Sequence, residues 1–129
     1  MVMEKNNKIM GLQKKQSTFT FNIHLLITFA FKQGFELTFG EVFRTVEQQT
    51  IYFNTGRSKT MNSRHIQRLA VDFNIFKNGV LINDPKIIQP LGEYWMTLNT
   101  DNVWGGDWDR DHSTLDETFK DPYHFECRP

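Results

Sequence analysis

Two apolar patterns with different periods divide this chain between helix and sheet. From Phe19 to Phe31 apolar side chains recur every three or four residues, the period of a helix with one buried face. From residue 69 to 75 large apolar side chains occupy every second position, as in a half-buried strand. We therefore expect an α+β fold in which a small antiparallel sheet packs with helices. The positions expected to be buried on the helix are Phe21, Leu25, Leu26, Phe29 and Ala30.

Shorter signals extend this outline along the chain. Residues 35–39 also alternate, and Asn78-Gly79 is typical of a hairpin turn that follows the second strand. Thr45 followed by Gln48 is a capping-box pattern, which predicts the start of a helix. Pro90 is expected to begin another helix. Residues 124–126 are expected to form a short terminal strand.

The length of the chain indicates one domain, because 129 residues suffice for a single hydrophobic core. We divide it into a flexible basic segment, residues 1–16, and a folded domain, residues 17–129. The apolar segment after Phe19 is interrupted by Asn22 and His24 and is too short to span a bilayer. No A-x-A cleavage site follows it. We therefore expect no signal peptide, no insertion into a membrane, and a monomer.

Cysteine content and charge exclude several classes of protein. The single cysteine, Cys127, excludes an internal disulfide framework and a cysteine-rich zinc finger. The net charge of zero argues against a general polyanion binder, so we expect no nucleic-acid partner. The zero conceals an asymmetry, because residues 101–129 carry three basic and eight acidic side chains. That acidic stretch is either a solvated surface or part of a site for a divalent cation.

Two histidines and one aspartate are the candidates for a metal site. Asp72 is the one charged residue in the largely apolar run 69–76, where a carboxylate is costly unless it is paired or bound to a metal. His65 and His124 would complete a set of three ligands, which leaves a fourth position open as in catalytic zinc sites. Asp121 lies three residues before His124 and could act as a general base. On spacing alone, two histidines and an aspartate this far apart in sequence are more often unrelated surface or core residues.

The order of these residues resembles the zinc D-alanyl-D-alanine carboxypeptidase family. It is most similar to the L-alanyl-D-glutamate endopeptidase branch, which bacteriophage endolysins use. The resemblance covers roughly residues 25–126 and implies a single catalytic domain with the fold shared by hedgehog proteins and D,D-peptidases. The motifs that carry it are Ser63-x-His65, Asp72, Trp104-Gly105-Gly106-Asp107-Trp108 and Asp121-x-x-His124-Phe125-Glu126.

The resemblance assigns roles to individual residues. It implies that His65, Asp72 and His124 hold one zinc ion per chain. Asp121 takes the place of the catalytic acidic residue, and Arg44 that of an arginine associated with substrate or oxyanion binding.

Four further residues are expected to support the site or to contact substrate, namely Ser63, Trp104, Asp107 and Glu126. For Trp104 and for its neighbour Trp108, packing in the core is the alternative. The chain departs from the family at Arg68, where many members have glycine. That side chain is expected either to line the cleft or to pack outward.

The function implied is that of a zinc metallopeptidase which hydrolyses the L-alanyl-D-glutamate bond of the peptidoglycan stem peptide, as a phage or prophage endolysin. The alternatives are a D-alanyl-D-alanine carboxypeptidase and a non-catalytic zinc module that binds the wall. We expect the protein in the cytoplasm of the bacterial cell, acting on the periplasmic wall after release. A regulatory calcium ion at Asp107, Asp109 and Asp111 is a further alternative, although His112 stands where an EF-hand requires glycine.

Overall fold

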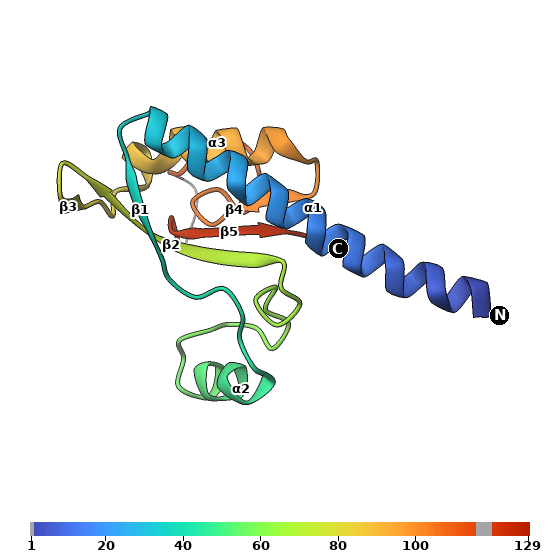
Figure 1. Ribbon diagram of the computed structural model, residues 1–129. Helices are drawn as coiled ribbons and strands as arrows, with labels where there is room; N and C mark the ends of the chain where they lie inside the picture. Colours follow the sequence, from blue (N-terminus) through green and yellow to red (C-terminus); the bar gives the residue numbers. More distant parts are fainter. Residues whose placement is uncertain (1, 116–119) are drawn as a thin grey trace.

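The computed structural model describes residues 2–115 and 120–129 of the chain, with side chains described from residue 11 onward. It confirms the α+β class, since three helices pack with a small antiparallel sheet (Figure 1). No helix in the described part of the chain is long and apolar enough to cross a bilayer. In chain order the elements are α1 (Val2–Lys32), β1 (Glu36–Phe39), α2 (Val46–Asn54), β2 (Ala70–Lys77), β3 (Val80–Leu81), α3 (Pro85–Leu98), β4 (Asn102–Trp104) and β5 (His124–Cys127).

The sheet is antiparallel and has the strand order β1-β2-β5-β4, with β3 paired to β2 as a hairpin. Asn78 and Gly79 turn that hairpin with φ angles of 53° and 77°, as the sequence predicts. The central pair, β2 and β5, places Asp72 opposite His124 and Ala70 opposite Glu126. Side chains two residues apart in a strand share a face, so this register puts Asp72, His124 and Glu126 on the same side of the sheet.

Helices α1 and α3 pack against each other and cover the other face of the sheet (Figure 1). The core between them is built on large aromatic side chains that are fully buried, including Trp95, Phe73 and Phe125. Trp95 Nε1 donates hydrogen bonds to the carbonyls of Val103 and Glu126 at 3.2 and 3.0 Å. The helices therefore anchor the strands that carry the candidate site.

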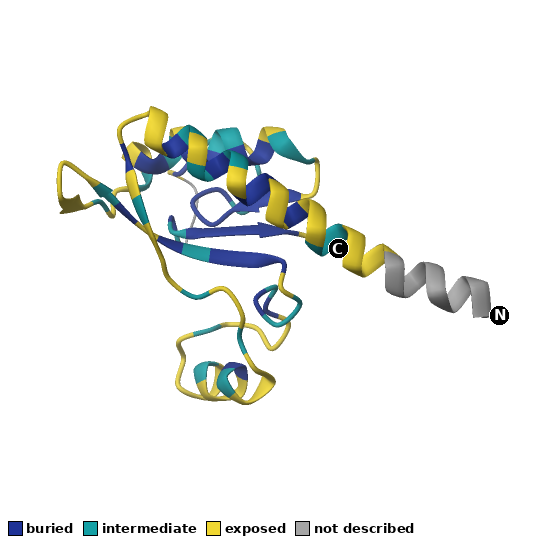
Figure 2. Cartoon of the chain, viewed as in Figure 1, coloured by how far each residue is buried: buried dark blue, intermediate teal, exposed yellow. Residues whose placement is uncertain are grey.

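Helix α2 lies on the side of the sheet away from α1 and α3 (Figure 1). It begins as predicted, because the Thr45 side chain accepts a hydrogen bond from the Gln48 N–H at 3.1 Å. Much of this region is exposed, whereas β2 and β5 are mostly buried (Figure 2). The segment 55–69 leads from α2 back to β2 and brings His65 to the sheet.

Two local predictions were wrong. Helix α3 begins at Pro85, capped by the Asp84 side chain, and Pro90 lies inside it. An aspartate at the N-cap followed by a proline in the first turn is a typical helix start, and Asp84 and Pro85 form this pattern more than one turn before Pro90. Phe21 is 59% exposed, because the buried face of α1 is rotated toward Phe19 and Ile23.

The division of the chain at residue 16 has no counterpart in the backbone. Helix α1 is continuous through this position. The Lys15 ammonium pairs with Asp101 at 3.3 Å, and the Gln16 side chain donates to the Gln67 carbonyl at 2.9 Å. The flexibility of residues 1–16 stays a prediction.

Candidate metal centre and active site

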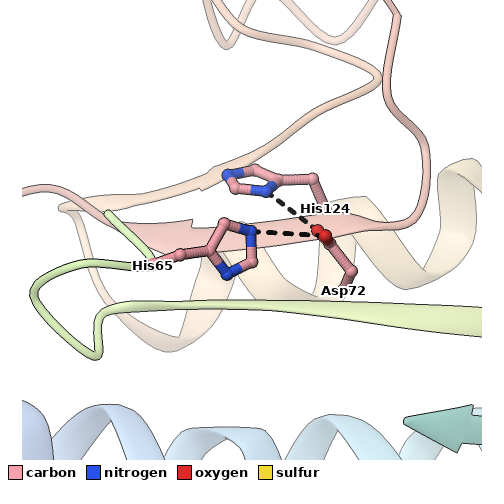
Figure 3. A group of neighbouring side chains, drawn as sticks. All are labelled: His65, Asp72 and His124. Atoms are coloured by element: carbon pink, nitrogen blue, oxygen red, sulfur yellow. Dashed lines mark hydrogen bonds and ion pairs between the residues drawn. The ribbon is translucent and has the colours of Figure 1, made fainter. Parts of the chain in front are cut away.

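The structure brings His65, Asp72 and His124 together at one edge of the central strand pair. Each offers one ligand atom, and these atoms lie within 4.8 Å of one another. Asp72 is the centre of the group, with Oδ2 3.3 Å from His65 Nε2 and Oδ1 3.0 Å from His124 Nδ1. Figure 3 shows both imidazole rings pointing at this carboxylate. Strand pairing positions Asp72 and His124, and the turn before β2 supplies His65.

The outer nitrogen of each imidazole is held by an oxygen that can only accept a hydrogen bond. His65 Nδ1 lies 3.3 Å from the Val42 carbonyl, and His124 Nε2 lies 2.7 Å from Glu126 Oε1. These contacts place a proton on the outer nitrogen and leave the inner nitrogen to act as a ligand. Among the described residues, buried His65 Nε2 has no hydrogen-bond partner. Two imidazole nitrogens and a carboxylate that converge in this way fit a divalent transition metal such as zinc.

The charges in this group are strongly coupled. Burial acts against the charged form of His124, but hydrogen bonds to Asp72 and Glu126 raise its pKa to about 9. Burial likewise acts to raise the pKa of Asp72, yet the neighbouring imidazoles of His124 and His65 hold that pKa well below its usual range. Without a metal the His124 imidazole is therefore a cation between two carboxylates. A metal ion would take the place of that proton.

Asp121 lies beside this centre on the loop before β5. Burial raises the pKa of its carboxyl group, and the negative charge of Asp72 raises it further. The loop is held by three hydrogen bonds in which Gly105 N–H donates to the His124 carbonyl, Asp121 N–H to the Gly105 carbonyl and His124 N–H to the Asp121 carbonyl. A Cβ on Gly105 would meet the Asp121 carbonyl oxygen at 2.1 Å, so this approach requires glycine. A carboxyl group with a raised pKa is suited to exchange protons with a substrate.

Arg44 and Ser63 form a connected pair next to His65. The Arg44 guanidinium is bound to Glu41 through Nε, and to Gln49 and Ser63 through Nη1 at 2.6 and 3.2 Å. Ser63 Oγ also accepts a hydrogen bond from the His65 N–H at 3.3 Å. Ser63 therefore supports the backbone that carries His65, and the described residues give Arg44 Nη2 no hydrogen-bond partner.

A cavity of about 530 Å³ opens beside the centre. His65, Asp121, His124 and Glu126 line one part of it. The remainder is lined largely by polar and cationic residues that the sequence analysis did not single out, among them Tyr52, Arg57, Lys59, Asn62, Arg64 and Arg128. The sequence contains a pattern that could have indicated the cations among them, since residues 48–71 contain four basic side chains and no acidic one.

Two of the expected supporting residues lie away from this cavity. Trp104 is fully buried, packs where a Cβ on Gly92 would be 2.1 Å from its ring, and donates from Nε1 to the Pro122 carbonyl at 2.9 Å. For Trp104 the alternative prediction, packing in the core, is therefore the correct one, whereas Trp108 lines the cavity. Asp107 is also fully buried.

The carboxylate of Asp107 organises a turn. It accepts hydrogen bonds from the N–H groups of Asp111 and His112 at 3.1 and 2.8 Å. Burial raises the pKa of this carboxyl to about 6. Oxygens of Asp107, Asp109 and Asp111 lie within 4.8 Å of one another. The hydrogen bonds of Asp107 account for its position without an ion, and a regulatory calcium stays a prediction.

The backbone conformation at Arg68 is one that favours the glycine found in many members of the family. Arg68 has a φ angle of +56°, in the left-handed region where glycine is favoured. Its guanidinium lies over the Phe43 ring, 4.1 Å from the centroid. Of the two predicted orientations, the structure gives outward packing, on the exposed side chain of Phe43.

Comparisons with known proteins identify the family of this chain and a solved structure with a similar fold. Residues 24–127 match the model of the family described as phage L-alanyl-D-glutamate peptidase. The fold is similar to the crystal structure of the L-Ala D-Glu endopeptidase ChiX of Serratia marcescens, with a TM-score of 0.66 and 22% identity over 85% of this chain and 77% of that one. A search of curated proteins finds no significant match. The family model covers most of the chain and confirms the resemblance that the sequence motifs predict. This protein therefore belongs to the phage L-alanyl-D-glutamate peptidase family, the endopeptidases that cut the peptide stem of peptidoglycan.

Proposed function

We propose that this peptidase is zinc-dependent and that it hydrolyses the bond between L-alanine and D-glutamate in the stem peptide. The observation that carries the proposal is the convergence of His65 Nε2, His124 Nδ1 and the Asp72 carboxylate on one point, with Asp121 beside them. Two imidazoles and one carboxylate leave a coordination position open, which a catalytic zinc requires and a structural zinc does not.

Each residue near the bond has a distinct task. A zinc ion held by His65, Asp72 and His124 would polarise the alanine carbonyl and acidify the attacking water. Asp121 accepts a proton from that water as its oxygen bonds to the alanine carbonyl carbon. Asp121 then delivers the proton to the glutamate nitrogen as the carbon–nitrogen bond breaks. The raised pKa of Asp121 supports the first transfer, because a carboxylate whose conjugate acid has a higher pKa is the stronger base.

Arg44 and Glu126 act around the reacting atoms. Arg44 lines the cavity, and its Nη2 is the group we assign to the negative oxygen that develops on the alanine carbonyl. Glu126 is a positioning residue, because it holds the outer nitrogen of His124 and thereby fixes the ring.

Digestion of purified muropeptides tests the bond and the metal together. The expected product has a new N-terminal D-glutamate, which end-group analysis and mass spectrometry identify. A chelator should abolish cleavage and added zinc should restore it. His65→Ala should be inactive and free of zinc. His24→Ala, a change on the exposed surface of α1, should behave as the wild type.

Other products separate the alternatives. Release of free D-alanine without new N-terminal D-glutamate would identify a D-alanyl-D-alanine carboxypeptidase. Zinc at one equivalent with no cleavage of any muropeptide would identify a binding module. An unchanged rate after complete removal of metal would contradict the zinc mechanism.

The cellular setting follows from the substrate. We propose that the protein is made in the cytoplasm and reaches the periplasmic wall after release. We also propose that it acts as a monomer and without a nucleic-acid partner.

A further inference from the structure

The cavity beside the metal centre carries an excess of positive charge although the whole chain is neutral. Five arginine or lysine side chains line it, against the carboxylates of Asp121 and Glu126. A volume of about 530 Å³ is that of a pocket for a ligand rather than for a single scissile bond. The cavity is thus suited to a substrate with negative charges of its own.

Partners within the protein balance several of these cations. Arg44 is paired with Glu41. Arg128 Nε lies 3.7 Å from Glu126 Oε2, and the charge of Arg64 helps to lower the pKa of Glu126. These side chains have structural reasons to be where they are.

Arg57 differs from them. Within the described residues its guanidinium has no hydrogen bond or ion pair. Its backbone is nevertheless well placed, because the N–H groups of Arg57 and Ser58 both donate to the Tyr52 carbonyl, at 2.8 and 3.1 Å, at the end of α2. An exposed cation on a fixed backbone at the wall of a cavity is available to a ligand.

The chemistry of the substrate supplies an anion for it. This step rests on the proposed cleavage between L-alanine and D-glutamate. Alanine has no ionisable side chain. Glutamate has two carboxyl groups, only one of which can continue the chain, so the glutamate half keeps at least one free carboxylate.

We propose that Arg57 binds a free carboxylate on the D-glutamate half of the stem peptide. The binding orients the substrate, with the glutamate half toward segment 55–64 and the alanine carbonyl at the metal centre. Arg57 is a specificity residue in this assignment, because it contacts a part of the substrate that does not react. The carboxylate belongs either to the glutamate itself or to a residue that follows it.

Three synthetic peptides separate these sources. All contain the L-alanyl-D-glutamate bond. The first has both the free glutamate carboxylate and a free C-terminal carboxylate, the second has the glutamate carboxylate as an amide, and the third has the C-terminal carboxylate as an amide. The wild type should cleave either the second or the third peptide with a KM roughly tenfold higher than its KM for the first, since a hydrogen bond to a charged group is worth that factor or more. The amide concerned identifies the source.

Arg57→Gln should raise the KM for the first peptide by the same factor and leave kcat unchanged. It should also remove the difference in KM between the first peptide and the amide that the wild type cleaves poorly. Arg57→Lys should restore part of that difference. The matched control is Lys86→Gln, an exposed cation on α3 that does not line the cavity and should keep wild-type discrimination.

Discrimination that survives in Arg57→Gln would overturn the assignment, and so would a loss of kcat that is equal for all three peptides. Equal cleavage of the three peptides by the wild type would overturn it while leaving the proposed function intact. Failure of the wild type to cut any of them at the alanine–glutamate bond would overturn the proposed function itself.

Discussion

The two sides of the cavity are built in different ways. The strand pair β2 and β5 carries Asp72, His124 and Glu126 on a mostly buried sheet, whose backbone hydrogen bonds fix their spacing (Figure 2). The segment 55–68 carries Arg57, Ser63 and His65 and has no strand or helix of its own.

Side-chain hydrogen bonds hold this second segment, where the strands are held by backbone hydrogen bonds to each other. Gln49 is fully buried on α2, and its Nε2 donates to the Ser58 hydroxyl at 2.9 Å and to the Thr60 carbonyl. Arg44, which precedes α2, donates to Ser63 Oγ, and Ser63 Oγ in turn accepts from the His65 N–H. The difference indicates a division of labour, in which the strands fix the spacing of two candidate ligands, and the segment brings the third candidate ligand, His65, together with the cation Arg57.

Asp121→Asn tests the site most strongly, because in the proposed mechanism Asp121 transfers the proton and is not a metal ligand. We expect the rate of muropeptide cleavage to fall by roughly 10²–10⁴-fold, since the general base and acid is lost. Zinc content, measured by elemental analysis, should stay at one equivalent. Asp101→Asn, which removes an exposed carboxylate paired with Lys15, should leave both values unchanged. Loss of zinc from Asp121→Asn would place this residue among the ligands.

The pH dependence of the metal-free protein tests the strand side alone. The folded-state pKa of His124 is raised to about 9 from 6.5, so protonated His124 stabilises the fold fully below pH 6.5. This contribution is lost as the pH rises to 9, and the free energy of unfolding should fall by on the order of 3 kcal/mol. Denaturant titrations between pH 6 and 9.5 measure it. His124→Asn should show no such fall in this range, and a wild-type protein with a flat profile would contradict the ion pair.

Glu126→Ala distinguishes a positioning role from a merely structural one. Removing the acceptor of the His124 Nε2 proton should weaken zinc binding by roughly 10–100-fold, because the ring loses its orientation. Competition with a chromophoric chelator measures the affinity. Glu126→Gln keeps an acceptor oxygen and should retain most of it. If both variants bind zinc as the wild type does, Glu126 does not position the ligand.

Arg68 marks the junction between the two sides and has the smallest expected effect. Arg68→Ala and Arg68→Gly both remove the contact with Phe43, but only glycine relieves the cost of the left-handed conformation. The glycine variant should therefore be more stable than the alanine variant by about 1 kcal/mol in denaturant unfolding. Equal stabilities would show that the backbone relaxes at this position.

Much of the fold could be predicted because its signals are local. The Thr45 cap and the Asn78-Gly79 turn each depend on residues adjacent in sequence, and both are present. The alternation in β2 reflects the period of one strand. Pro90 misled because a single proline is also tolerated inside a helix whose start is fixed elsewhere, here by Asp84 and Pro85.

The candidate site could be predicted only in part. The order of His65, Asp72 and His124 predicted the candidate metal group through its resemblance to a family, and the structure brings the three residues together. The acidic C-terminal stretch also contains more than a solvated surface, since Asp107 and Glu126 are buried. Charge summed over long segments concealed the basic run from 48 to 71, and with it most of the cations of the cavity.

The sequence by itself determined the types of the elements, their caps and turns, and the identities of the candidate ligands, because each follows from periodicity or from motifs of a few residues. The tertiary structure decided which nitrogen of each histidine faces inward, that Trp104 is in the core while Trp108 lines the cavity, and that Arg57 shares that cavity with His124. These features depend on strand register and on contacts between segments far apart in the chain. A local pattern encodes backbone hydrogen bonding, whereas the convergence of side chains is fixed only when the whole core is packed.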